Sequence, residues 1–117
     1  MSSFARCVDV NANVKIYQLN CQGFLSKLPT LHQLMITEWK CDVALFSETW
    51  LLPTATTDMH LSLNSFVFFR RDRPYRTHGG VIVYVRDYLT VRGRQDLEHN
   101  NLDCITLELK ITGRKYF

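Results

Sequence analysis

The chain has 117 residues and a formal net charge of +3, and 46% of its residues are hydrophobic. These values are typical of one globular domain and exclude two domains of ordinary size. No apolar run resembles a signal peptide or reaches membrane-spanning length, and the four cysteines lack the short spacing of a zinc or redox motif. We therefore expect an intracellular protein, nuclear or cytoplasmic, that is not secreted, has no membrane partner and keeps its cysteines as free thiols.

Two strands and one helix are predicted in the first half of the chain. Residues 1–13 show no periodicity, so we expect them to form a disordered leader. Residues 14–19 and 42–47 are short apolar runs that favour strands. Between them, apolar residues recur at helical spacing and predict an amphipathic helix over residues 27–40, with Pro29 in its first turn.

A polar residue follows each of these two predicted strands. Asn20 closes the first apolar run, and Glu48 closes the second. A strand, helix, strand crossover makes the two strands parallel, so both residues emerge at the carboxyl edge of the sheet, where open α/β sheets bind ligands. We therefore expect Asn20 and Glu48 to share one cleft, to which the run from Gly79 to Val85 adds a third element.

Strands and polar loops alternate in the middle of the chain. Residues 53–64 predict a loop with one helical turn at most, and residues 65–69 predict a strand. Residues 70–78 contain no apolar run and predict a surface loop. The β-branched residues 81–85 then predict a further strand, in which Tyr84 is a packing residue.

The last segment predicts a strand that begins a hairpin. Residues 103–111 alternate polar and apolar side chains, which is typical of a half-exposed strand, and residues 112–113 favour a hairpin turn. The returning strand would begin at about residue 115. We therefore expect residues 14–117 to be a partial domain that is truncated at its C-terminal side.

The predicted loop over residues 70–78 opens a basic segment. Residues 70–94 contain seven arginines and two aspartates, so this segment is positively charged. One guanidinium group can donate two parallel hydrogen bonds to a phosphate, and a neighbouring aromatic ring offers a stacking face for a base. The candidates for nucleic-acid binding are Arg70, Arg71, Arg73, Tyr75 and Arg76. The alternative is a structural role in a solvated loop, with one arginine paired to Asp72.

Four short motifs occur in order along the chain, and together they resemble one family. They are Leu19-Asn20-Cys21-Gln22, Ser47-Glu48-Thr49-Trp50-Leu51, Phe69-Arg70-Arg71-Asp72-Arg73 and Gly79-Gly80-Val81-Ile82-Val83-Tyr84-Val85. In this order and spacing they resemble the endonuclease/exonuclease/phosphatase superfamily. The similarity is strongest to the apurinic-type endonuclease domain of non-LTR retrotransposons of the jockey and CR1 kind. It covers residues 14–117, which match the N-terminal half of the family domain.

The resemblance implies a fold and a metal. The family fold is a four-layer α/β sandwich with two mixed β-sheets face to face and helices outside. For this chain we expect its N-terminal half, an α/β unit with a mixed β-sheet and an outer helix. In the family, the residues at the positions of Asn20 and Glu48 are catalytic, and they form the site of the divalent metal ion, Mg²⁺ or Mn²⁺. Such hard ions favour oxygen ligands and need only one or two carboxylates beside a substrate phosphate.

The resemblance also implies an activity and leaves alternatives. The activity is hydrolysis of DNA phosphodiester bonds, which nicks the target site of a retrotransposon, with a reverse transcriptase domain expected downstream. The family's general-base histidine lies in the half that this chain does not match, so we expect the isolated chain to be inactive. One alternative is a non-catalytic fragment that binds nucleic acid or protein through residues 70–76. Another, within the superfamily, is a phosphatase of small phosphorylated ligands.

Overall fold

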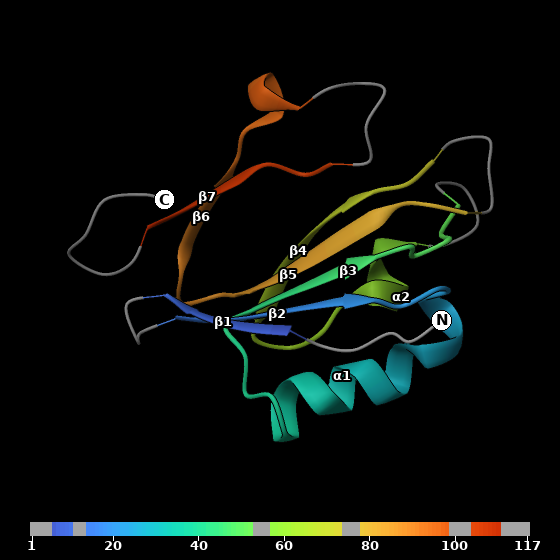
Figure 1. Ribbon diagram of the computed structural model, residues 1–117, viewed down its shortest axis with the longest axis horizontal. Helices are drawn as coiled ribbons and strands as arrows, with labels where there is room; N and C mark the ends of the chain where they lie inside the picture. The colour runs from blue at the N-terminus through green and yellow to red at the C-terminus, as the bar shows by residue number, and fades with distance from the viewer. Residues whose placement is uncertain (1–5, 11–13, 53–56, 74–77, 99–103, 111–117) are drawn as a thin grey trace.

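The computed structural model describes residues 6–10, 14–52, 57–73, 78–98 and 104–110. These residues form a mixed α/β structure (Figure 1). The strands are β1 (Arg6–Val10), β2 (Val14–Asn20), β3 (Val43–Ser47), β4 (Phe66–Arg71), β5 (Val81–Arg86), β6 (Thr90–Gly93) and β7 (Leu107–Lys110). The helices are α1 (Leu28–Thr37) and α2 (Asp58–Leu61), with short 3₁₀ turns η1 (Leu25–Lys27) and η2 (Gln95–Leu97).

Five strands form one mixed sheet, the main sheet, in the order β1-β2-β3-β5-β4. The central pair β2 and β3 is parallel, and Asn20 lies opposite Ser47 at its end. All other neighbouring strands in this sheet are antiparallel. The parallel pair confirms the predicted crossover, because α1 connects the two strands.

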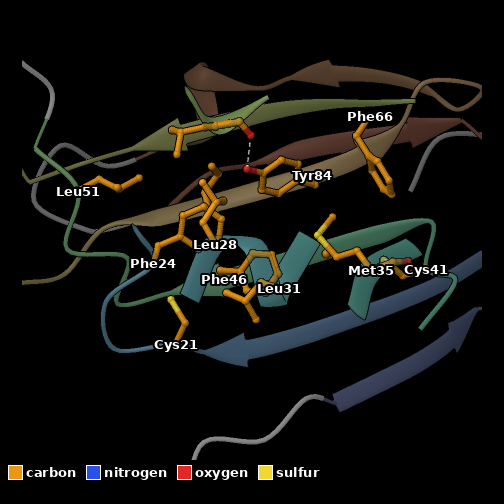
Figure 2. Packing of buried hydrophobic residues seen from close by; sticks show 13 residues of the cluster. Cys21, Phe24, Leu28, Leu31, Met35, Cys41, Phe46, Leu51, Phe66 and Tyr84 are labelled. Atoms are coloured by element: carbon orange, nitrogen blue, oxygen red, sulfur yellow. Dashed lines mark hydrogen bonds between the residues drawn. The ribbon is translucent and has the colours of Figure 1, made fainter. Parts of the chain in front are cut away.

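Helix α1 covers one face of the main sheet (Figure 1). Leu31 and Met35 are buried one turn apart on α1 and pack with Phe46 of β3 and Tyr84 of β5, as Figure 2 shows. Helix α1 begins where expected, with Pro29 in its first turn, where a missing N–H costs nothing. This packing confirms both the outer helix and the role of Tyr84 as a core residue.

The opposite face of the main sheet carries a second apolar cluster. Val43, Val83 and Val85 of β3 and β5 are buried there together with Leu109 of β7. Strands β6 and β7 pair with each other in an antiparallel two-stranded sheet, the small sheet, which lies on this side (Figure 1). The described residues therefore stack in three layers: α1, the main sheet and the small sheet.

The structure corrects four of the expected boundaries. Residues 6–10 of the expected leader form β1, because they pair in register with β2. Strand β4 continues to Arg71, where a loop was expected, because Arg70 and Arg71 pair with β5. Helix α1 ends at Thr37, since the Trp39 N–H turns back to the Leu34 carbonyl at 2.8 Å.

The last correction concerns the start of β7, which begins at Leu107, although the expected strand began at residue 103. Strand β6 was not predicted, and it pairs with β7. Residues 112–113, where the hairpin turn was expected, lie outside the described residues, as does the expected returning strand. None of the helices in the described ranges combines the length and apolarity needed to span a bilayer.

The cysteines agree with the expectation of free thiols where the structure describes them. Cys21 and Cys41 are buried and unbridged, and Cys104 is free and half-buried. Burial raises the pKa of the Cys21 thiol to about 11. The Cys21 thiol is therefore neutral at physiological pH, which fits a packing role beneath the carboxyl edge.

Candidate functional site

Asn20 and Glu48 lie at the same edge of the main sheet, the carboxyl edge, where β2 and β3 end. Asn20 is opposite Ser47 in the parallel register, and Glu48 is the next residue. The two chains continue side by side past the strands. The Cys21 N–H donates to the Ser47 carbonyl at 3.0 Å, and the Gly23 N–H donates to the Glu48 carbonyl at 2.9 Å. The backbone therefore brings the two predicted residues together.

The start of β5 joins the same edge. The Thr49 N–H donates to the Gly80 carbonyl at 3.3 Å, and the Trp50 N–H donates to the Gly79 carbonyl at 2.9 Å. The Gly79 N–H in turn donates to Glu48 Oε2 at 2.8 Å. The glycine pair is therefore the third element of this edge, as the sequence predicted.

Two donors from different segments hold one oxygen of the Glu48 carboxylate. Besides the Gly79 amide, the indole Nε1–H of Trp50 donates to Oε2 at 3.2 Å. Among the described residues, no donor reaches the other oxygen, Oε1. The described donors of this carboxylate are therefore both on Oε2.

Asn20 contributes a side-chain amide oxygen to this edge of the sheet. Its side-chain Oδ1 is buried and has no hydrogen-bond partner among the described residues. Strand alternation places Asn20 and Ser47 on the face of the main sheet that carries the small sheet, because their neighbours Leu19 and Phe46 pack on the α1 side. A buried polar atom without a partner is costly, and a bound cation or water would satisfy it.

The oxygens at this edge are of the chemical type that a hard divalent ion prefers. Within the described ranges, no three His, Cys, Asp or Glu side chains come together. A metal at the carboxyl edge would therefore rely on the Glu48 carboxylate and the Asn20 amide oxygen, with water or substrate oxygens completing its shell. Mg²⁺ is commonly bound in this way, whereas Zn²⁺ needs more nitrogen or sulfur ligands.

The backbone at this edge adopts conformations that are rare for residues other than glycine. Glu48 and Trp50 have positive φ angles of 55° and 57°. The neighbouring residues with positive φ are Gln22, Gly23, Gly79 and Gly80. Such conformations are strained for non-glycine residues and cluster at functional sites in proteins. The strain coincides with the residues that hold the Glu48 carboxylate.

Two of the predicted nucleic-acid contacts are committed inside the fold. Arg70 pairs with Asp72 and, at 3.1 Å, with Asp58, and its side chain is only 14% exposed. Arg71, on the other face of β4, donates to the Cys104 carbonyl at 3.2 Å and lies 3.5 Å from the Glu98 carboxylate. The pairing of one arginine with Asp72, proposed as the structural alternative, is thus present at Arg70.

Arg73 approaches the candidate site more closely. A Cβ atom added at Gly79 would lie 2.7 Å from Cδ and Cζ of Arg73, so this side chain passes directly over Gly79. Gly79 is also the amide donor to Glu48. Arg73 therefore places positive charge beside the carboxyl edge. The remaining candidates, Tyr75 and Arg76, lie outside the described residues.

Described residues of the main sheet help to line two cavities. One of about 200 Å³ borders Ser47, Val81 and Cys104 on the small-sheet side of the carboxyl edge. The other, of about 570 Å³, is lined by Phe69 and Arg71 of β4 and by Glu98. Neither of these two cavities is lined by Asn20 or Glu48.

Sequence reasoning missed the hydrogen bond that Trp50 donates to the Glu48 carboxylate. The indole does pack, with its ring 4.7 Å from that of His78, but it also donates to Glu48. The motif Glu48-Thr49-Trp50 was the available signal.

A scan of the sequence against protein-family models finds no match, and a search among curated proteins finds no similar sequence.

Proposed function

We propose that this chain carries the metal-binding half of the active site of a Mg²⁺- or Mn²⁺-dependent DNA endonuclease. The observation that supports this most directly is the buried Oδ1 of Asn20, which has no hydrogen-bond partner among the described residues and lies at the same edge as the Glu48 carboxylate. The order and spacing of the four motifs support the same function. The implied setting is the nucleus or cytoplasm, where a retrotransposon protein would nick its DNA target.

Each residue of this edge has a distinct part in the proposal. Glu48 supplies the negative charge for the ion, and Asn20 supplies a neutral oxygen. The Gly79 amide fixes the carboxylate, and Arg73 faces the backbone phosphates of DNA. When bound, the ion would supply positive charge to the phosphoryl oxygen and to the leaving oxygen.

The three-layer arrangement also fits the proposed fold. In a four-layer α/β sandwich, a second sheet faces the first across an apolar interface. The small sheet packs on the main sheet through Val83, Val85 and Leu109, as the first strands of such a second sheet would. We therefore propose that the chain is the N-terminal half of this sandwich.

Hydrolysis needs more than these residues provide. An attacking water must be activated by a base opposite the leaving group. The family's base and its transition-state donors lie in the half that follows the matched residues. In the proposed full protein that half would complete the site, with a reverse transcriptase domain downstream, and this chain alone would bind ion and DNA without cutting.

The binding-only alternative receives less support from the contacts. Among its candidate residues, Arg70 and Arg71 have guanidinium groups that contact acidic side chains of the fold. Arg73, the third candidate arginine that the structure describes, lies beside Gly79 at the carboxyl edge. The same residue therefore serves the endonuclease proposal.

An NMR titration tests the metal site. Adding MgCl₂ or MnCl₂ to the ¹⁵N-labelled chain should perturb the amides around Asn20 and Glu48 together, with weak affinity in the millimolar range because the protein ligands are few. Glu48→Ala should abolish the effect. Glu38→Ala, which removes an exposed carboxylate at the end of α1, should leave it unchanged. Unperturbed amides at both residues would contradict the metal site.

A binding assay tests the substrate class. Fluorescence anisotropy with a labelled DNA duplex at constant ionic strength should show that Mg²⁺ increases the affinity of the wild-type chain relative to Glu48→Ala. The comparison between the two proteins removes the screening effect of Mg²⁺ on DNA itself. Equal responses of both proteins to Mg²⁺ would contradict a site in which ion and phosphate meet.

A further inference from the structure

Trp50 occupies a backbone conformation that is rare for a large side chain. Its φ is 57°, in the left-handed region that normally favours glycine. The conformation is held by a hydrogen bond from the Trp50 N–H to the Gly79 carbonyl at 2.9 Å. Strain of this kind persists only where the surrounding structure imposes it, and it often serves a function.

The consequence of this conformation is the position of the indole nitrogen. The chain turns back at Glu48 and Trp50, so that Nε1 reaches Glu48 Oε2, two residues earlier, at 3.2 Å. The Gly79 amide donates to the same oxygen at 2.8 Å. Both donors bind Oε2, and among the described residues no donor is placed on Oε1.

The indole ring is itself held in place on two sides. A Cβ atom at Gly23 would lie 3.1 Å from Cε3 of Trp50, so the ring lies against the glycine backbone. The His78 ring meets it edge-on, at 4.7 Å between centroids and 68° between planes. The residue is nevertheless 37% exposed. The ring is thus fixed at the rim of the site without being buried in the core.

From this geometry we propose that Trp50 is the positioning residue of the metal site. It orients the Glu48 carboxylate so that Oε1, together with the Asn20 Oδ1, is presented to the ion. It touches neither the ion nor the substrate and acts through Glu48 alone. The inference rests on the proposed function, because it assigns a role in the same site. Donors to a ligating group commonly tune metal affinity in this way.

The variant Trp50→Phe tests this role, since it removes the indole N–H and keeps an aromatic ring against Gly23. The affinity for Mn²⁺, followed by NMR at the Asn20 amide, should fall by about tenfold. Trp39→Phe is the matched control. Trp39 stacks on Tyr17 at 4.8 Å between ring centroids, away from the carboxyl edge, and its replacement should leave Mn²⁺ affinity unchanged.

A second measurement uses the intact Trp50 side chain. The two indole N–H resonances of the wild-type protein should respond differently to Glu48→Ala: that of Trp50 should shift and exchange faster with water, and that of Trp39 should not. This result does not depend on metal or on the folding of Trp50→Phe. A Trp50 indole that ignores the loss of Glu48 would overturn the proposal.

The outcomes separate this inference from the proposed function. Wild-type protein that binds Mn²⁺ at Asn20 and Glu48, with equal affinity in Trp50→Phe, would refute the positioning role and leave the metal site intact. Wild-type protein that binds no ion at either residue would refute the metal site and with it the positioning role. A loss of affinity confined to Trp50→Phe and Glu48→Ala supports both.

Discussion

Arg70 shows how a residue with the chemistry of a DNA contact is committed to the fold. Its side chain is 14% exposed, and that of its partner Asp72 is 3% exposed. The guanidinium also donates to the Leu52 carbonyl at 3.4 Å. A carboxylate as buried as Asp72 needs a paired charge, because desolvation of an isolated charge is far more costly. Arg70 therefore links β4 to the chain before and after it.

We predict that Arg70→Ala lowers the free energy of unfolding by about 3 kcal/mol, because it leaves Asp72 buried without a partner. Arg92→Ala is the control, since Arg92 pairs with Glu108 while 56% exposed. An exposed pair contributes about 0.5 kcal/mol. Urea denaturation of the variants measures both values.

A double variant checks the cause of the Arg70 effect. Arg70→Met combined with Asp72→Leu removes both charges and should recover most of the stability lost in Arg70→Ala. A double variant as unstable as Arg70→Ala would show that the charge of Asp72 is not the source of the loss.

At the scale of elements, the sequence predicts those whose own side chains carry a pattern. Strands β2, β3 and β5 are apolar runs, and α1 has helical spacing, so each was expected close to its observed position. Strand β6 contains a single large apolar residue, Val91, and exists because it pairs with β7. Strand β1 likewise depends on β2. Partners distant in sequence leave no local pattern to detect.

The same distinction holds for the candidate site. The meeting of Asn20 and Glu48 follows from one crossover, which the alternation of strand and helix predicts. The indole contact of Trp50 depends instead on positive φ angles at Glu48 and Trp50, and neither residue type indicates such a conformation. Only the glycines in the neighbouring segments are a local signal of this backbone geometry.

Gly80, which immediately precedes β5, allows a direct test of this geometry. Gly80 has a φ of 89°, and a Cβ there would lie 2.6 Å from Thr49 Oγ1. We predict that Gly80→Ala destabilises the protein by about 2 kcal/mol and perturbs the Glu48 amide. Gly93→Ala is the control, because its Cβ would meet its nearest neighbour at 3.9 Å. Thermal unfolding and NMR spectra of both variants test the prediction, and equal effects would contradict it.

At the scale of the whole molecule, one chain of hydrogen bonds joins three elements. The Tyr84 hydroxyl of β5 donates to the Leu61 carbonyl of α2 at 2.6 Å (Figure 2). His32 Nε2 of α1 lies 3.1 Å from the same hydroxyl. The hydroxyl has a single hydrogen, which it donates to the Leu61 carbonyl. His32 must therefore donate to the Tyr84 oxygen, which assigns the imidazole proton to Nε2. The core thus holds its helices to the sheet through polar as well as apolar contacts.

Burial lowers the pKa of His32 below its usual value, which makes stability depend on pH. A histidine in the unfolded chain has a pKa of about 6.5. Below that pH the unfolded state therefore binds a proton more strongly than the folded state does. Stability is therefore complete above about pH 6.5 and falls as the pH drops toward the lower folded-state pKa. Urea midpoints measured from about pH 7.5 to about pH 5.5 should show this loss.

Two variants assign the pH effect. His32→Gln should flatten the dependence over this interval, whereas His60→Gln, which changes an exposed residue of α2, should preserve it. A dependence that survives His32→Gln would assign the effect to another group.

The unusual backbone at the carboxyl edge has a consequence for tracing ancestry. Gly23, Gly79 and Gly80 sit where an added Cβ would meet a neighbouring side chain, and all three have positive φ. Substitutions can accumulate in the helix and in the loops between these glycines. We expect replacement of the glycines themselves to displace Asn20 or Glu48. Divergent descendants should therefore retain Asn-x-x-Gly, Glu-Thr-Trp and Gly-Gly as three islands with variable spacing. A search with that gapped pattern would find distant cousins that whole-length alignment overlooks.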